Sequence, residues 1–171
     1  MFERDIISQL AAWKTDTNRK PLVVHGARQV GKTWTLKYFG REYFDDVAYF
    51  SLDKDESGLC DVFRTTKDPQ RIIQHLSFLH GKKIEPQTTL LILDEIQECN
   101  EALNALKYFC EEAPEYAVAC AGSLLGIYLN HVGKSFPVGK VNHLYMYPLT
   151  FTEFLRTKDP VMHEYMHSLI R

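Results

Sequence analysis

Residues 26–33 combine glycines, a lysine and a threonine at a spacing suited to binding phosphate groups. They read Gly-Ala-Arg-Gln-Val-Gly-Lys-Thr and fit the pattern G-x-x-x-x-G-K-[ST]. Glycines let a backbone curl so that successive N–H groups point at phosphate oxygens. A helix that starts near Lys32 adds the positive end of its dipole. Lys32 can reach the β- and γ-phosphates of a nucleotide, and the Thr33 hydroxyl can bind Mg²⁺.

This loop and the residue after it form the expected nucleotide-binding segment. The segment comprises Gly26, Ala27, Arg28, Gln29, Val30, Gly31, Lys32, Thr33 and Trp34. Trp34 could lie against the nucleotide or, as is more common for a tryptophan on a helix, in the core. Arg28 could contact phosphate or a neighbouring subunit, or it could be solvated. An apolar run precedes the loop and helical sequence follows it, which is the context that this motif requires.

Two adjacent carboxylates follow the apolar run at residues 90–93. The run is suited to a buried parallel strand, and Asp94 and Glu95 come directly after it. The end of that strand should open on the same sheet edge as the phosphate loop. Asp94 can hold Mg²⁺ through water, and Glu95 can orient and deprotonate an attacking water. We therefore predict Thr33 and Asp94 as metal-site residues, and Glu95 and Lys32 as catalytic residues.

Ser123 is the third candidate for a catalytic role. It follows the apolar run at residues 116–121 and precedes a predicted short helix at residues 124–130. Its hydroxyl could sense the γ-phosphate or position water, or it could cap the helix. The two roles are compatible.

Apolar runs and helical periods alternate along the chain. Strands are expected at residues 21–25, 47–52, 88–93, 116–121 and 141–147, and helices at residues 2–13, 32–39, 68–80, 102–111, 124–130 and 150–156. Such alternation is typical of an α/β fold, in which helices cover both faces of a parallel sheet. Asp68 before Pro69 marks one helix start, because it offers a cap and a first helical residue.

Composition excludes several classes of protein. The chain has 171 residues, of which 45% are hydrophobic, enough for one domain with its own core. The formal net charge is −2, so the overall charge does not favour nucleic acid or anionic lipid as a partner. The longest apolar stretch is far short of the roughly 20 residues of a membrane span, and the first residues do not resemble a secretory signal. We expect a cytoplasmic protein.

The cysteines do not indicate a metal site. Cys60, Cys99, Cys110 and Cys120 form no C-x-x-C pair and have no histidine at zinc-finger spacing. We expect no structural zinc, and a chain of this length does not need a disulfide framework. Cys120 lies in an apolar run and is expected in the core, while Cys99 and Cys110 are expected near the ends of a helix.

Together these motifs resemble a prokaryotic family of AAA-type P-loop ATPases, in which a C-terminal domain of unknown function usually follows the ATPase domain. The resemblance covers nearly the whole chain and rests on residues 26–33, Leu91-Ile-Leu-Asp-Glu-Ile-Gln97, Ala121-Gly-Ser123 and Tyr147-Pro-Leu-Thr-Phe-Thr-Glu-Phe154. It implies a P-loop NTPase fold with a five-stranded parallel sheet in the order 5-1-4-3-2. It also implies ATP and Mg²⁺ as cofactors, Glu95 as catalytic base and Ser123 as sensor.

Two departures from the family pattern bear on function. Members usually carry Gly-Arg before the fifth strand, where this chain has Gly139-Lys140. If that arginine stabilises charge in the transition state, Lys140 supplies charge without the bidentate fork. Members also usually extend further. We therefore expect an ATPase domain with an N-terminal helix over residues 1–157, and the start of a linker or truncated C-terminal region over residues 158–171.

The expected function is Mg²⁺-dependent binding and hydrolysis of ATP, coupled to an attached domain or partner. Self-association and contacts to a C-terminal domain are further expectations. The alternative is a switch or scaffold that binds ATP with negligible turnover and binds DNA or a partner through a missing C-terminal domain. Lys140 in place of arginine slightly favours it. A small-molecule kinase is a third option, although no arginine-rich lid segment stands out.

Overall fold

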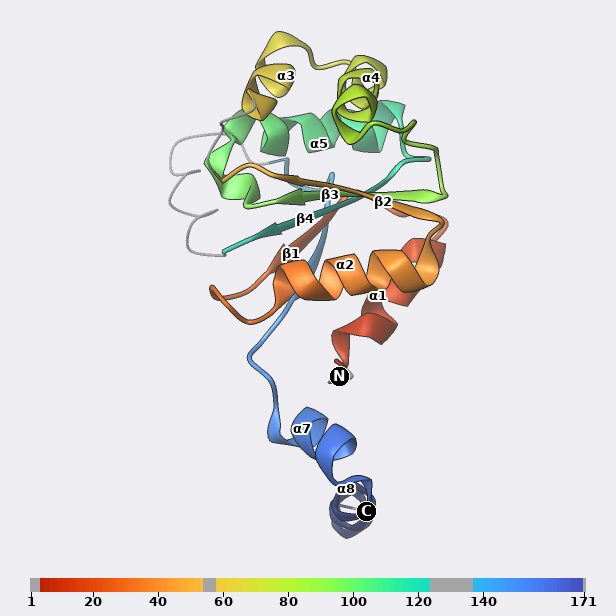
Figure 1. Ribbon diagram of the computed structural model, residues 1–171, viewed down its shortest axis with the longest axis vertical. Helices are drawn as coiled ribbons and strands as arrows, with labels where there is room; N and C mark the ends of the chain where they lie inside the picture. The colour runs from red at the N-terminus through yellow and green to blue at the C-terminus, as the bar shows by residue number, and fades with distance from the viewer. Residues whose placement is uncertain (1–3, 54–57, 124–136, 171) are drawn as a thin grey trace.

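The computed structural model describes residues 4–53, 58–123 and 137–170, and its centre is a five-stranded sheet (Figure 1). The strands are β1 (Leu22–His25), β2 (Asp46–Ser51), β3 (Thr89–Asp94), β4 (Ala117–Gly122) and β5 (Asn142–Tyr145). They lie in the order β2-β3-β4-β1-β5, and every neighbouring pair is parallel. This confirms the predicted α/β class and, read from the other edge, the order 5-1-4-3-2.

Helices cover both faces of this sheet. They are α1 (Ile6–Thr15), α2 (Lys32–Tyr43), α3 (Leu59–Thr65), α4 (Pro69–His80) and α5 (Asn100–Glu112). Figure 1 shows α1 and α2 on one face and α3, α4 and α5 on the other. The short 3-10 helix η1 (Ile96–Glu98) joins β3 to α5. The result is a three-layer arrangement with a hydrophobic core on each side of the sheet.

The apolar runs of the central strands divide their side chains between these two cores. Leu22 and Val24 pack in the core that contains α1 and α2, whereas Val23 packs in the core that contains α3, α4 and α5. Strands β1, β3 and β4 are buried along their whole length, as expected for central parallel strands. Strand β5 lies at an edge and alternates half-buried and exposed residues.

Two predicted helix starts are confirmed by their caps. Asp68 accepts a hydrogen bond from the Gln70 N–H at 3.0 Å, and Pro69 is the first residue of α4. Helix α7 (Phe151–Lys158) begins with a capping box. In it Thr150 Oγ1 accepts from the Glu153 N–H at 3.1 Å, and the Glu153 carboxylate accepts from the Thr150 N–H at 2.9 Å.

Helix α8 (Pro160–Leu169) follows α7, and the two helices lie apart from the three layers (Figure 1). Only Glu153 and Leu155 of α7 are buried, and α8 has no buried residue. Among the residues that the structure describes, no helix is long and apolar enough to cross a membrane.

The helices differ from the sequence-based expectation in several places. Helix α3 and η1 are not among the predicted elements, because each is too short to display a helical period. Helix α1 begins at Ile6 instead of residue 2, and α2 continues to Tyr43 instead of ending at residue 39. The predicted helix at residues 124–130 lies outside the described residues.

The cysteines differ from expectation as well. Cys60 of α3 and Cys99, at the start of α5, form a disulfide. Nothing in their local sequence indicates this pairing, because the two residues lie 39 positions apart. Cys110 and Cys120 are free, and Cys120 is buried as predicted.

Candidate nucleotide-binding site

The predicted phosphate-binding loop connects the end of β1 to the start of α2. It therefore lies at the carboxyl edge of a strand that is paired on both sides, where parallel sheets bind ligands. Gln29 and Gly31 have φ angles of 62° and 94°, which curl the backbone. Gly31 is also the N-cap of α2, so the positive end of the α2 dipole faces the loop.

Gly26 begins the loop at a point where the backbone of another segment comes very close. A Cβ atom at this position would lie 2.4 Å from the Met146 carbonyl oxygen. The Met146 N–H donates to the His25 carbonyl at 2.7 Å, which holds the residue after β5 against the start of the loop. The first glycine of the motif is thus required by packing, because any side chain would collide with the Met146 backbone.

Lys32 extends back across the loop from the first turn of α2. Its Nζ donates to the carbonyl oxygens of Gly26 at 2.7 Å and Ala27 at 2.6 Å. Burial lowers the pKa of Lys32, while Glu95 and Asp94 act in the opposite direction. These contacts hold the ammonium group against the first two residues of the loop.

Asp94 lies beside Thr33, which brings the two predicted motifs together. Thr33 Oγ1 donates to Asp94 Oδ2 at 2.6 Å, and the Tyr49 hydroxyl donates to the same oxygen at 2.7 Å. The Asp94 residue is 5% exposed. Burial and the bond to Asp94 raise the pKa of Tyr49, so its hydroxyl keeps its proton. Hydroxyl and carboxylate oxygens are ligands that Mg²⁺ prefers, so this pair fits the predicted metal site.

Glu95 adopts the left-handed backbone conformation, with φ of 52° and ψ of 46°. Its N–H donates to Asp94 Oδ1 at 2.9 Å, and its carboxylate oxygen Oε2 accepts a short hydrogen bond from Gln97 Nε2. These contacts orient the predicted catalytic carboxylate at the end of β3. Gln97 is 8% exposed and belongs to the candidate site. Its hydrogen bond to Glu95 could not be predicted from its position in the sequence motif.

Ser123 lies at the same sheet edge as the loop. It directly follows β4, whose last residue Gly122 is in register with His25, the residue before the loop. The rest of the predicted segment is more exposed. Arg28 is exposed, and Trp34 is 46% exposed and stacks on Tyr38, so Trp34 does not lie in the core.

A histidine pair supports the loop from the side of β5. His25 Nε2 and His143 Nδ1 lie 2.8 Å apart, and His25 also stacks on Tyr145. His25 is 3% exposed. Burial, followed by His143 and Lys32, lowers the pKa of His25 to about 4, so the ring is neutral at neutral pH. This pair could not be predicted from the sequence, because the two residues lie on separate strands.

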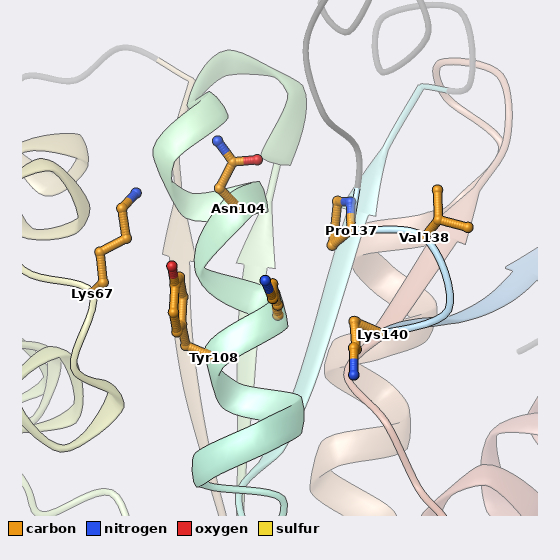
Figure 2. A pocket seen from close by; sticks show the side chains of 7 residues that line it. Lys67, Asn104, Tyr108, Pro137, Val138 and Lys140 are labelled. Carbon is orange, nitrogen blue, oxygen red and sulfur yellow. The ribbon is translucent and has the colours of Figure 1, made fainter.

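Lys140 lies at the opposite edge of the sheet from the phosphate loop. It precedes β5, whose first residue Asn142 is in register with the first residue of β1. Its Nζ pairs with Glu111 of α5 at 3.1 Å. Figure 2 shows Lys140 beside a pocket of about 440 Å³, which is lined by Lys67, Asn104, Lys107, Tyr108, Pro137, Val138 and Lys140. Lys140 therefore cannot contact a nucleotide bound in its own loop.

The fold and the paired motifs define a P-loop nucleotide-binding protein. Residues 18–155 match the model of the AAA domain, so the chain belongs to this family of AAA-type P-loop ATPases. Among solved structures the chain is similar to C. elegans PCH-2, with a TM-score of 0.45 and 13% identity. That match covers 82% of this chain and 41% of PCH-2, so the chain spans less than half of that protein. None of the curated proteins compared with this chain matches it.

Proposed function

We propose that this protein binds ATP with Mg²⁺ and hydrolyses it. The observation that carries the proposal is the 2.6 Å hydrogen bond between Thr33 and Asp94, which joins the phosphate loop to the acidic pair. A phosphate-binding loop alone indicates only anion binding. A loop whose threonine lies against a buried carboxylate provides a place for the metal that accompanies nucleotide phosphates.

Each predicted site residue then has a role that its position supports. Lys32 and the loop N–H groups stabilise negative charge on the phosphates. Thr33 and, through water, Asp94 hold Mg²⁺, which when bound neutralises charge on the β- and γ-phosphates. Glu95 orients the attacking water and accepts its proton, and Ser123 senses the γ-phosphate. The selection of adenine follows from the family.

The contact between Gln97 and Glu95 prepares the catalytic carboxylate for this role. Gln97 donates to Oε2, which leaves Oε1 of Glu95 to accept the proton of water. The left-handed backbone at Glu95 ends the extended conformation of β3 directly before η1. The amide of Gln97 therefore orients the carboxylate at this turn.

Hydrolysis in this proposal drives or gates a change in an attached domain or partner, in the cytoplasm. Self-association is part of the proposal, because membership of the AAA family suggests that the chain can oligomerise. The rival function is an ATP-bound switch or scaffold with negligible turnover. The position of Lys140 favours slow turnover by an isolated chain, because its charge lies at the far edge of the sheet.

Calorimetry of Mg-ATP binding, followed by measurement of phosphate release in the same samples, tests the proposal. The variants are Lys32→Ala and, as a control, Lys83→Ala, whose side chain is 75% exposed and pairs with Glu85. We expect wild-type chain and control to bind Mg-ATP and release phosphate, and Lys32→Ala to lose binding. Binding without release would favour the switch, and release only with an added acceptor would favour a kinase. No binding by the wild-type chain would overturn the proposal.

A further inference from the structure

Arg4 joins three segments of the chain that lie far apart in sequence. Its Nη1 donates to the Val30 carbonyl of the phosphate loop at 3.2 Å, and its Nη2 donates to the Tyr147 carbonyl at 2.6 Å. Its Nε donates to Glu153 Oε1 of α7 at 3.1 Å. The Arg4 side chain is 11% exposed and that of Glu153 is 6% exposed, so this ion pair is largely shielded from solvent.

The Glu153 carboxylate is fixed through both of its oxygens. Oε1 also accepts from the Asp5 N–H at 3.0 Å, and Oε2 accepts from the N–H and hydroxyl of Thr150 at 2.9 Å and 3.2 Å. Burial raises the pKa of Glu153, but the hydrogen bonds from Thr150, Asp5 and Arg4 outweigh it and the pKa lies below its usual value. The carboxylate therefore stays ionised at neutral pH and ties the start of α7 to Arg4.

The bond from Arg4 to Val30 fixes one peptide group of the phosphate loop. In a trans peptide the C=O and N–H groups point in opposite directions. Anchoring the Val30 oxygen on Arg4 therefore turns the Gly31 N–H away from Arg4. Gly31 is the N-cap of α2, and the amides at a helix N-terminus are the ones that bind phosphate.

Both glycines of the loop rest on the segment that leads from β5 to α7. A Cβ at residue 26 would meet the Met146 carbonyl, and one at residue 31 would lie 3.6 Å from Met146 Cε and 3.9 Å from Arg4 Nη1. The loop that would bind phosphate and the segment that ends at α7 are thus packed together and share the Arg4 guanidinium.

We propose that Arg4 is a positioning residue that couples the nucleotide site to α7. The inference rests on the proposed function and names the element that responds to the nucleotide. Arg4 holds the loop in its phosphate-binding shape only while Glu153 holds Arg4, so an ordered loop and a docked α7 favour each other. Phosphate binding and α7 docking then strengthen each other by the same factor. Helix α8, which has no buried residue, moves with α7.

Two measurements test this inference. Calorimetry gives the affinity for Mg-ADP, and hydrogen exchange of the α7 amides is followed with and without Mg-ADP. We use ADP because it has no γ-phosphate to be hydrolysed during the measurement. The variants are Arg4→Gln, Arg4→Lys and Glu153→Gln. The matched control is Arg19→Gln. Arg19 is also a partly buried arginine, and it donates to the carbonyls of Lys14, Pro114 and Glu115 without contact to the loop. The control thus reports the effect of losing an equivalent set of structural hydrogen bonds.

We expect Arg4→Gln to weaken Mg-ADP binding about tenfold, the equivalent of one charge-assisted hydrogen bond, while Arg19→Gln binds as the wild type does. Mg-ADP should slow α7 exchange in the wild type and in Arg19→Gln but not in Arg4→Gln. Lysine lacks the planar guanidinium that donates to three acceptors, so Arg4→Lys should also bind Mg-ADP weakly. This variant tests the proposal if Arg4→Gln does not fold.

Glu153→Gln separates positioning from simple charge attraction. Removal of a negative charge near the site strengthens anion binding if only charge matters, but weakens it if Glu153 acts by holding Arg4. Tighter binding by Glu153→Gln, wild-type affinity in Arg4→Lys, or equal effects of Arg4→Gln and Arg19→Gln would overturn the inference while leaving the proposed function intact. Failure of the wild-type chain to bind Mg-ADP would remove the proposed function and the inference with it.

Discussion

Thr33 and Asp94 lie 61 positions apart in sequence, and the threonine hydroxyl donates to the aspartate carboxylate at 2.6 Å. The hydroxyl comes from the first turn of α2, and the carboxylate comes from the last residue of β3. Strand β4 separates β3 from β1, so the bond links motifs carried by strands that are not neighbours. Two oxygen ligands suited to one cation are therefore already adjacent in the folded chain.

Asp94→Asn should remove most of the Mg²⁺ dependence of ATP binding. An amide keeps the shape of the carboxylate but lacks its charge, so affinity for Mg-ATP should fall roughly tenfold or more, toward that for metal-free ATP. Calorimetry with Mg²⁺ and with a chelator measures the difference. Asp46→Asn is the control, because that carboxylate lies at the start of β2 and bonds to His80 at 2.8 Å. A full Mg²⁺ response in Asp94→Asn would show that the metal site lies elsewhere.

Glu95→Gln should abolish turnover and spare binding. Loss of the base that accepts the proton of water should lower phosphate release by about 100-fold or more, within the usual contribution of general base catalysis. Glu98→Gln removes an exposed carboxylate three residues further on and should turn over normally. Equal phosphate release from Glu95→Gln and the wild type would exclude Glu95 as the base.

Much of the fold could be predicted from local pattern, because the central strands are apolar runs of the right length and the start of α4 carries a clear cap at Asp68. Helix α3 could not, since its seven residues are too few to show a period. The disulfide between Cys60 and Cys99 could not either. Its formation depends on α3 packing beside the start of α5, and neither cysteine carries a local sign of its partner.

The disulfide should contribute measurably to stability. Closing a loop between residues 39 positions apart lowers the entropy of the unfolded chain, which corresponds to about 4 kcal/mol in the chain-entropy model. Urea unfolding with and without a reductant should show a loss approaching this value in the wild type. The double variant Cys60→Ala, Cys99→Ala should not respond to the reductant. Cys110→Ser, which changes a free cysteine, should respond as the wild type does. An equal midpoint with and without reductant would contradict the prediction.

Stability should fall as the pH falls from about 6.5 to about 4. In the unfolded chain His25 binds a proton near its usual pKa of 6.5, whereas in the folded chain burial lowers that pKa to about 4. Burial also lowers the pKa of His143. Between these pH values the unfolded state binds more protons, so acid favours unfolding and stability rises with pH.

Urea unfolding at about pH 7.5 and about pH 5 measures this slope. His25→Gln should flatten it, because the variant has no imidazole to protonate on unfolding. His75→Gln, which changes an exposed histidine of α4, should keep the slope of the wild type. If both variants show the wild-type slope, His25 is not its source.

The candidate site was predictable where short sequence motifs contain the residues that could bind phosphate and metal. Lys32, Thr33 and Asp94 meet as their motifs indicate, because parallel strands end at a common edge. Tyr49, Gln97 and Arg4 were not foreseen. Tyr49 depends on the register of β2 against β3, and Arg4 reaches Glu153 across 149 positions, so both contacts arise from the fold and leave no signature in nearby residues.

The backbone conformation of Glu95 sets the stability of the folded chain against the proposed catalytic role of this residue. A left-handed conformation costs a glutamate roughly 1 kcal/mol that asparagine or glycine avoids to a large extent. The variant Glu95→Asn should therefore unfold at a higher temperature than the wild type, but it would lack the carboxylate that accepts a proton. The strained turn at the residue that we propose as catalytic base therefore lowers the stability of the folded chain, and the more stable variant would lack that base.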